Sequence, residues 1–179
     1  MAKTQANRGK ELERLIENAL KRGDVYWQRN HPKTTYAKLG GRLQAFPSGN
    51  GPPDFLVGAN GVWYLFEAKS FKGERWQFDG LAPHQAADLD LAEKHGLRTG
   101  VLLGQFAEDD KLVQAWWVDW RTLCPLWHRW HLGMAKHGQA GLRAEELSSL
   151  DEFAPPPLLG VLLSPPTVER HVNRRTPSA

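Results

Sequence analysis

Three charged residues interrupt a stretch that otherwise has the composition of a buried pair of strands. The segment PPDFLVGANGVWYLFEAKSF, residues 52–71, carries no charge except Asp54 near its start and Glu67 and Lys69 near its end. Charged groups are costly in a protein core unless they are paired or take part in chemistry. The three side chains therefore indicate either a strand end at the surface or a chemical site.

The alternation of side chains along a strand decides which of these groups can meet. Strands are predicted at 54–58 and 62–69, with a turn-like Ala-Asn-Gly between them. Successive side chains of a strand point to opposite faces, so Glu67 and Lys69 share one face. If the two strands pair as a hairpin, Asp54 lies beside Glu67.

Two carboxylates in contact repel each other, and one takes up a proton unless a cation lies between them. Magnesium is typically bound by one or two carboxylates together with water and substrate oxygens. Such an ion can polarise a phosphate and orient water, and Lys69 can then position or deprotonate that water or offset charge on the phosphate. A surface ion pair is the alternative, because a Glu-x-Lys sequence is common. Asp54 behind Pro53 favours the chemical interpretation.

The remaining pattern predicts the elements that position these residues. An apolar stripe ended by glycine predicts a helix over 9–22, and Pro and Gly delimit a second helix over 83–96. Further expected elements are a short strand at 25–29, strands at 98–104 and 112–118, and a Trp-rich helix within 116–132. This order predicts an α/β fold with a mixed central β-sheet flanked by helices.

Residues 30–53 have the composition of a long basic loop, rich in Gly, Pro, Ser and Thr. Loops of this length are usually functional or disordered. We expect one domain over residues 1–132 that includes this loop, and a C-terminal extension over 133–179 whose end, about a dozen residues, is disordered. Several of the eight tryptophans are expected to build the core or a dimer interface: Trp116, Trp117, Trp120, Trp127 and Trp130.

Charge and cysteine content limit the class of protein. Lys and Arg outnumber Asp and Glu by ten to four in residues 1–42, whereas the acids lead by fifteen to ten in residues 43–164. An acidic middle with basic ends suits a carboxylate site served by segments that bind nucleic acid; a solvated basic helix is the alternative. The only cysteine, Cys124, excludes an intramolecular disulfide and a multi-cysteine zinc site. With no apolar span and no secretory leader, a soluble cytoplasmic protein with no membrane partner is expected.

Pro53-Asp54 together with Glu67-Ala68-Lys69 resembles the PD-(D/E)XK nuclease pattern. More narrowly, the chain resembles the RecU-type Holliday junction resolvases, including their phage relatives. The similarity begins at RGKELE, residues 8–13, which is similar to the family's R-G-x-x-x-E opening. It continues through the Asp54 strand, FEAKSFKGERWQF and His84-Gln85, to the strands that end near residue 118.

This resemblance implies a restriction-endonuclease-like fold and a homodimer that cuts four-way DNA junctions with magnesium or manganese. It places the protein in the cytoplasm of a bacterium or of a phage-infected host cell. It also implies that 30–53 is a stalk-like insertion, a protruding loop that enters the junction centre. The chain departs from the family at Pro52, where Thr is frequent, in a shorter stalk, and in its final third, which has no clear match.

The resemblance also assigns roles to single residues. Its catalytic set is Asp54, Glu67, Lys69, Gln85 and Glu13, and its metal set is Asp54, Glu67 and Ala68. Periodicity does not choose between Glu11 and Glu13, whereas the family pattern selects Glu13. Gln85 heads the apolar stripe of its helix, where local hydrogen bonding in the first turn is the alternative role. The expected DNA contacts are Arg8, Lys10, Lys33, Lys38, Arg42, Lys72 and Arg75.

Other interpretations stay open at this point. Trp76 can stack on a base or pack on the core, and Tyr36 and Phe46 can wedge into a junction or fix the loop. His128 and His131, with no third ligand apparent, are interpreted as ordinary helix residues. The functional alternatives are a restriction- or flap-type nuclease of the same superfamily and a non-catalytic protein that binds junctions with the same fold.

Overall fold

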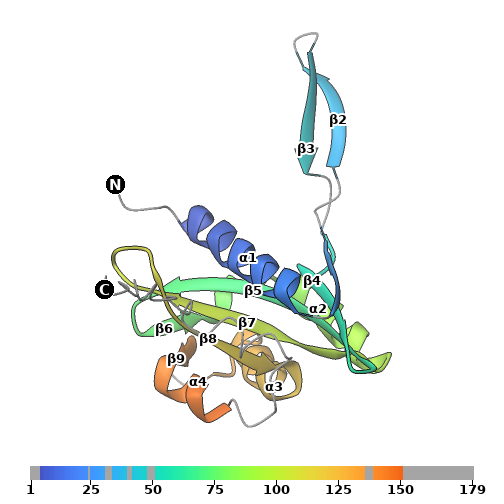
Figure 1. Cartoon of the computed structure of the whole chain (residues 1–179). Coiled ribbons are helices and arrows are strands. Elements are labelled where there is room, and N and C mark those ends of the chain that lie inside the picture. The colour runs from blue at the N-terminus through green and yellow to red at the C-terminus, as the bar shows by residue number, and fades with distance from the viewer. Residues whose placement is uncertain are drawn as a thin grey trace, which may run out of the picture.

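The computed structural model describes residues 5–23, 25–30, 34–39, 42–47, 51–135 and 139–150, without the side chains of 5–6, 34–39, 42–47 and 149 (Figure 1). The helices are α1 (Gln5–Arg22), α2 (Pro83–Lys94), α3 (Trp120–His131) and α4 (Ala144–Leu150), with the 3-10 turn η1 (Phe78–Gly80). The strands are β1 (Tyr26–Arg29), β2 (Thr34–Leu39), β3 (Arg42–Pro47), β4 (Phe55–Ala59), β5 (Val62–Lys72), β6 (Arg75–Gln77), β7 (Arg98–Phe106), β8 (Leu112–Asp119) and β9 (Gly141–Arg143).

Five strands form the central sheet in the order β1-β4-β5-β7-β8. β4 and β5 are an antiparallel hairpin, closed by a turn in which Asn60 and Gly61 have positive φ. α2 connects β5 to its parallel neighbour β7, and β8 returns antiparallel beside β7. The predicted α/β fold with a mixed sheet flanked by helices is therefore confirmed.

α1 covers one face of the sheet. Its stripe of Leu12, Ile16 and Leu20 is fully buried in a cluster with apolar side chains of β4 and β5. The helix also lies close over β7, because Gly104 has no side chain there. A Cβ at Gly104 would lie 2.7 Å from Leu12 Cδ1, which is closer than packed carbon atoms approach.

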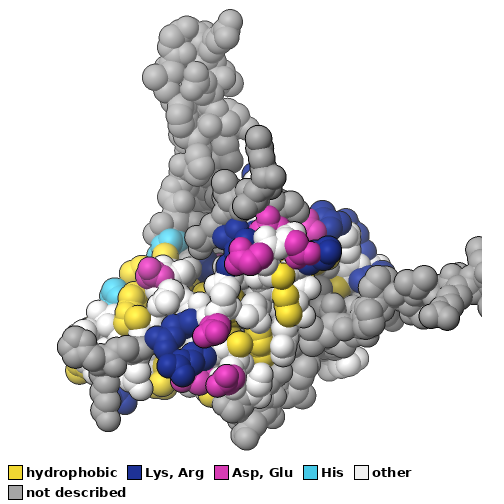
Figure 2. All heavy atoms as spheres, turned by 90° about the vertical axis from the view of Figure 1, so that its left-hand side faces the viewer, with side chains coloured by type: hydrophobic (Ala, Val, Ile, Leu, Met, Phe, Trp, Pro, Cys, Tyr) yellow, Lys and Arg dark blue, Asp and Glu magenta, His cyan; other side chains and the backbone are white. Residues whose placement is uncertain are grey.

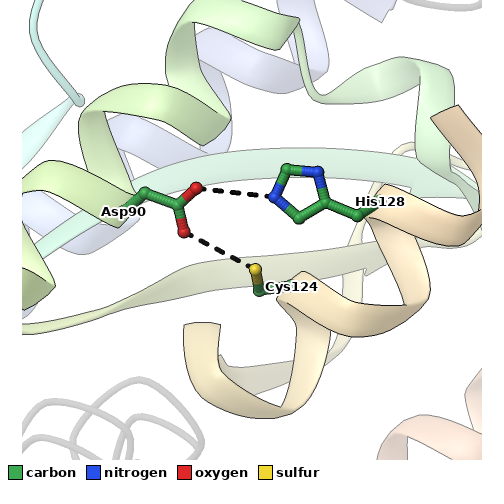
Figure 3. A group of neighbouring side chains, drawn as sticks. All are labelled: Asp90, Cys124 and His128. Atoms are coloured by element: carbon green, nitrogen blue, oxygen red, sulfur yellow. Dashed lines mark hydrogen bonds and ion pairs between the residues drawn. The ribbon is translucent and has the colours of Figure 1, made fainter. Parts of the chain in front are cut away.

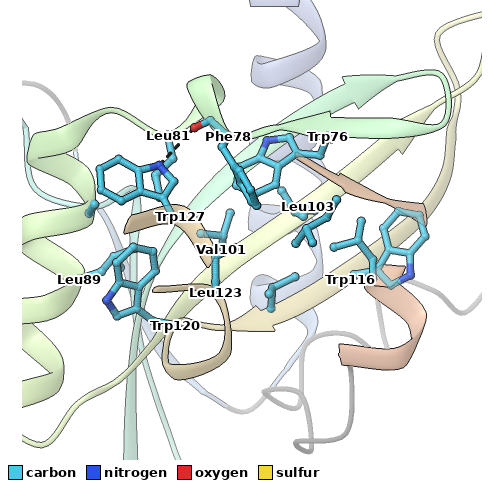
Figure 4. Close-up of a cluster of buried hydrophobic side chains, with 14 of the residues drawn as sticks. Trp76, Phe78, Leu81, Leu89, Val101, Leu103, Trp116, Trp120, Leu123 and Trp127 are labelled. Carbon is cyan, nitrogen blue, oxygen red and sulfur yellow. Dashed lines mark hydrogen bonds between the residues drawn. The ribbon is translucent and has the colours of Figure 1, made fainter. Parts of the chain in front are cut away.

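α2, α3 and the C-terminal elements cover the opposite face with a second apolar cluster (Figure 4). The predicted core role of the tryptophans is confirmed for Trp116, Trp117, Trp120 and Trp127, which are at most 3% exposed, while Trp130 packs at the edge of the cluster. Trp76 is 2% exposed, so it belongs to the core and does not stack on a base.

The prediction that 30–53 is a loop is wrong over two segments, because β2 and β3 pair there as antiparallel strands. Figure 1 shows this hairpin standing away from the central sheet. Both segments hold β-branched or aromatic residues, and Gly40-Gly41 lies between them in the sequence. That composition is typical of a hairpin, but the Gly, Pro and Ser residues on either side are typical of a loop and led to that prediction.

The C-terminal elements also differ from the expected pattern. β9 pairs with β6, and Leu142 and Leu147 are buried in the second cluster, so residues 139–150 pack on the same body as α2 and α3. Trp116 and Trp117 lie in β8, as the strand predicted at 112–118 requires, and the Trp-rich helix begins at Trp120. The expected disorder at the C-terminal end concerns residues outside the described ranges. No helix within those ranges has both the length and the apolarity of a membrane span.

Packing of α2 against the sheet can be tested with two leucines of that helix. Leu89 is fully buried, whereas Leu91 is 57% exposed. Leu89→Ala is expected to lower the free energy of unfolding by about 2–5 kcal/mol, because it removes buried methyl groups and leaves a cavity. Leu91→Ala is the matched control, with an expected change within about 0.5 kcal/mol. Equal effects in denaturant unfolding would contradict this orientation of α2.

Candidate active site

The two acids of the sequence pattern meet in the β4–β5 hairpin. Phe55 pairs with Phe66, so Asp54, the residue just before β4, lies opposite Glu67. Burial raises the pKa of Glu67, and the two carboxyl groups are close enough that the negative charge of Asp54 raises it further. Asp54 Oδ2 accepts a hydrogen bond from the backbone N–H of Ala68, at 2.9 Å. The predicted proximity of the two acids is therefore present in the structure.

Glu67 is a buried acid without a full set of partners. Its side chain is 1% exposed, and its Oε2 lies 3.4 Å from Lys69 Nζ but makes no hydrogen bond within the described part of the chain. Burial, and then the negative charge of Asp54, raise the pKa of Glu67 from 4.5 to about 8, although Lys69 opposes this shift. Without a cation, the protonated form of Glu67 is therefore favoured.

Lys69 is held between β5 and the start of α2. Its Nζ donates to Gln85 Oε1 at 2.8 Å, in addition to the ion pair with Glu67. The same Gln85 oxygen accepts from the backbone N–H of Ala82 at 3.0 Å, in the arrangement that caps a helix start. Gln85 thus links the first turn of α2 to the lysine, and its predicted position near the acids agrees with this geometry.

Glu13, rather than Glu11, is the α1 acid on the side of Asp54. Arg29 of β1 forms ion pairs with Glu13 and, at 2.6 Å, with Glu17. Burial is the largest cause of the raised pKa of Glu13; Arg29 opposes it, and the charge of Asp54 adds to it. Glu11 instead pairs with Arg14 on the helix surface. Sequence reasoning did not identify Arg29, since nothing local shows that β1 lies beside α1.

A groove of about 590 Å³ begins at Ala68 and Lys69, and three of the predicted DNA contacts, Arg8, Lys72 and Arg75, line it. Asp110, in the β7–β8 turn, lies 3.5 Å from both Arg8 and Lys72. Figure 2, which views this end of the molecule, accordingly shows described basic side chains interspersed with acidic ones. A phosphate group that enters the groove has to compete with Asp110 for these cations.

The structure shows less about the other predicted DNA contacts. Lys10 is exposed on α1. Lys33 lies outside the described residues. The backbone of Lys38 and Arg42 is described in β2 and β3, but their side chains are not, and the same holds for Tyr36 and Phe46. The roles of these residues stay predictions.

The residues of the metal set fit a hard divalent cation. Asp54 and Glu67 supply adjoining carboxylates, and the buried Glu67 Oε2 has no hydrogen-bond donor among the described residues. Ala68 can contribute only its main-chain oxygen. In an extended strand the N–H and C=O of one residue point the same way, so this oxygen lies on the side where the Ala68 N–H meets Asp54. Carboxylate and carbonyl oxygens are the ligands that magnesium and manganese use.

His128, interpreted from the sequence as an ordinary helix residue, lies beside two further potential ligands in the structure. Asp90, Cys124 and His128 place one potential ligand atom each within 4.8 Å of the others, outside the acid pair. Cys124 and His128 are four residues apart, a spacing visible in the sequence. Asp90 lies on a different helix, so the set depends on how α2 docks against α3. His131 instead stacks on Trp127.

No protein-family model matches this chain, and no curated protein sequence matches it. Among solved structures, the chain is similar to the 1.6 Å structure of Hjc from Archaeoglobus fulgidus, a Holliday junction resolvase from an archaeal hyperthermophile. That match has 14% sequence identity and a TM-score of 0.46, and it covers 79% of this chain and 93% of that chain. At this similarity nothing about the chemistry of this chain follows from the match, so function depends on the geometry of the site.

The raised pKa of Glu67 predicts how stability changes with pH in the presence of a chelator. Between pH 4.5 and about 8, the folded protein keeps a proton on Glu67 that the unfolded chain has lost. The free energy of unfolding therefore falls as pH rises through this window, by at most about 1.4 kcal/mol per pH unit from this group. Denaturant unfolding at several pH values should show a shallower fall for Glu67→Gln than for the wild type.

The matched control for this measurement is Glu145→Gln, since Glu145 is an exposed acid on α4. It should keep the wild-type slope. An unchanged slope in Glu67→Gln would show that Glu67 is not the group that retains the proton.

Proposed function

We propose that this protein is a metal-dependent DNA endonuclease of the PD-(D/E)XK class that resolves four-way, or Holliday, junctions. The observation that carries the proposal is the buried acid pair, in which Glu67 lies against Asp54 and beside Lys69. If Glu67 and Lys69 formed an ion pair only for stability, a second acid beside Glu67 would not help, because the charge of Asp54 adds to burial in raising the pKa of Glu67. Such an arrangement is expected where a cation displaces the proton and binds both acids.

The proposed chemistry is hydrolysis of a phosphodiester bond. Asp54, Glu67 and the main-chain oxygen of Ala68 would hold magnesium or manganese. When bound, such a cation supplies charge neutralisation and polarisation of the phosphate. Lys69, fixed by Glu67 and Gln85, donates to the attacking water or to the phosphate oxygen beside it. In-line attack at phosphorus with release of the 3′ oxygen gives 5′-phosphate and 3′-hydroxyl ends.

The basic groove supports a nucleic-acid substrate. Arg8, Lys72 and Arg75 line the space next to Lys69, and a backbone phosphate can replace Asp110 as the partner of Arg8 and Lys72. Phosphate contacts orient a duplex but do not read its sequence. Selectivity is therefore expected to follow the shape of branched DNA rather than base sequence.

Two further features fit a junction substrate. The β2–β3 hairpin leaves the sheet after β1 and returns just before Asp54, so an element that enters a junction would be attached next to the acids. A four-way junction is close to two-fold symmetric, and a two-fold homodimer would present one site to each of two opposed strands. The motifs that begin at Arg8 and end at Gln85 support a RecU-type resolvase within the class.

Asp54→Asn tests the catalytic assignment. The substitution keeps the shape of the side chain but removes a charge that the cation needs. Cleavage of a four-way junction in magnesium should fall more than about 100-fold, while junction binding in calcium or EDTA is retained. Asp109→Asn, at an exposed aspartate that pairs with Lys111, is the control and should cut at the wild-type rate. Equal cutting by Asp54→Asn and the wild type would refute the site.

Deletion of residues 34–47 tests the hairpin. If β2 and β3 enter the junction, the truncated protein should lose most of its preference for a four-way junction over linear duplex, while its thermal unfolding stays close to that of the full chain. The hairpin is a sheet of its own, separate from the central five strands. A truncated protein that still discriminates junction from duplex would remove this role.

The functional alternatives are distinguished in the same assay by their substrates. A restriction-type nuclease of the superfamily would prefer linear duplex, and a flap nuclease would prefer flapped DNA. A non-catalytic junction-binding protein would bind the four-way junction without cutting it in magnesium or manganese.

A further inference from the structure

A second cluster of potential metal ligands lies between α2 and α3 and shares no residue with the acid pair. Asp90 of α2 faces Cys124 and His128, which are one helical turn apart on α3 (Figure 3). Asp90 Oδ1 lies 3.5 Å from Cys124 Sγ, and Asp90 Oδ2 lies 3.4 Å from His128 Nε2. One carboxylate therefore joins a thiol and an imidazole from the neighbouring helix.

The surroundings of Asp90 fix its orientation. The buried indole of Trp120 donates its N–H to Asp90 Oδ1 at 2.6 Å. Carboxylates that bind metals commonly accept such an outer hydrogen bond, which orients them and tunes their basicity. The Asp90 and His128 side chains are 31% and 45% exposed, so a cation from solvent can reach the cluster.

The cluster does not have the order of a thiol nucleophile and its base. Asp90 lies between Cys124 and His128, so it is the carboxylate, not the imidazole, that accepts the thiol hydrogen bond. The arrangement therefore offers ligand atoms rather than a reactive thiol.

We propose that Asp90, Cys124 and His128 bind one divalent cation of the zinc type, with the fourth position open to water. Zinc bonds to oxygen, nitrogen and sulfur of about 2.0–2.3 Å imply ligand-to-ligand separations of about 3.5 Å in a tetrahedral site. One ligand atom of each residue lies within 4.8 Å of the others. Asp90 lies 3.4 Å from His128 Nε2 through Oδ2 and 3.5 Å from Cys124 Sγ through Oδ1. Thiolate and imidazole ligands favour zinc over magnesium, which separates this site chemically from the all-oxygen acid pair.

A cation at this position would join the two helices that cover one face of the sheet. α2 also carries Gln85, which contacts Lys69, so the same helix serves both sites. A ligand that binds only the folded chain raises its stability in proportion to the logarithm of its concentration above Kd. The proposal does not depend on nuclease activity, and its test uses metal binding and thermal unfolding.

Cobalt is a direct probe, since cobalt bound to a thiolate gives a near-ultraviolet charge-transfer band. Full-length protein without an affinity tag, freed of metal by a chelator, is titrated with Co²⁺ and then with Zn²⁺. We expect one Co²⁺ per chain with a thiolate band, displacement of that band by Zn²⁺, and a rise in Tm with Zn²⁺. Cys124→Ser should abolish the band, and Asp90→Asn and His128→Gln should weaken Co²⁺ binding at least about tenfold.

Two variants are matched controls. His131→Gln changes a histidine on the same helix that stacks on Trp127, and Asp54→Asn changes the acid pair; both should keep the full band. Absence of a thiolate band at saturating Co²⁺ in the folded wild type would overturn the proposal and leave a hydrogen-bonded cluster only. A band that persists in both Asp90→Asn and His128→Gln would overturn the ligand set. Circular dichroism of each variant confirms that it is folded.

Discussion

The candidate site is built around the burial of the Glu67 carboxyl against Asp54. An ionised carboxylate in this position lacks the water it would need, and its neighbour has the same charge. The structure tolerates the pair with a proton on Glu67, a backbone donor from Ala68 to Asp54, and the ammonium group of Lys69 beside Glu67. Each of these devices can be replaced by one cation. If the proposed cation binds, the energetic cost of the pair would become affinity for the metal.

Helix α2 helps to position the residues around the acid pair. Its first turn presents Gln85 to Lys69, and the middle of the helix buries Leu89 against the sheet. Asp90, the next residue, faces α3 through Trp120, Cys124 and His128. The position of one short crossover helix therefore sets the lysine of the acid site and the carboxylate of the second cluster together. A shift of α2 would disturb both groups of side chains.

The basic side chains of the groove are paired with an acid, just as Lys69 is paired with Glu67. Arg8 and Lys72 converge on the Asp110 carboxylate, so these cations are held in position before any substrate arrives. A protein that binds a polyanion gains from such pre-arranged cations, since less side-chain freedom is lost on binding.

The local arrangement of the site follows from the amino-acid pattern. The period of two along β5 put Glu67 and Lys69 on one face, and the short turn after β4 fixed a register in which Asp54 lies opposite Glu67. The helical period likewise identified the buried stripe of α1, and the element order predicted the mixed sheet. Contacts between distant elements depend on the packing of the folded chain: the contact of Gln85 with Lys69, the salt bridge of Arg29 with Glu13, and the meeting of Asp90 with α3. Periodicity records which face of an element is apolar, but where that face docks depends on the summed packing of side chains distant in the chain.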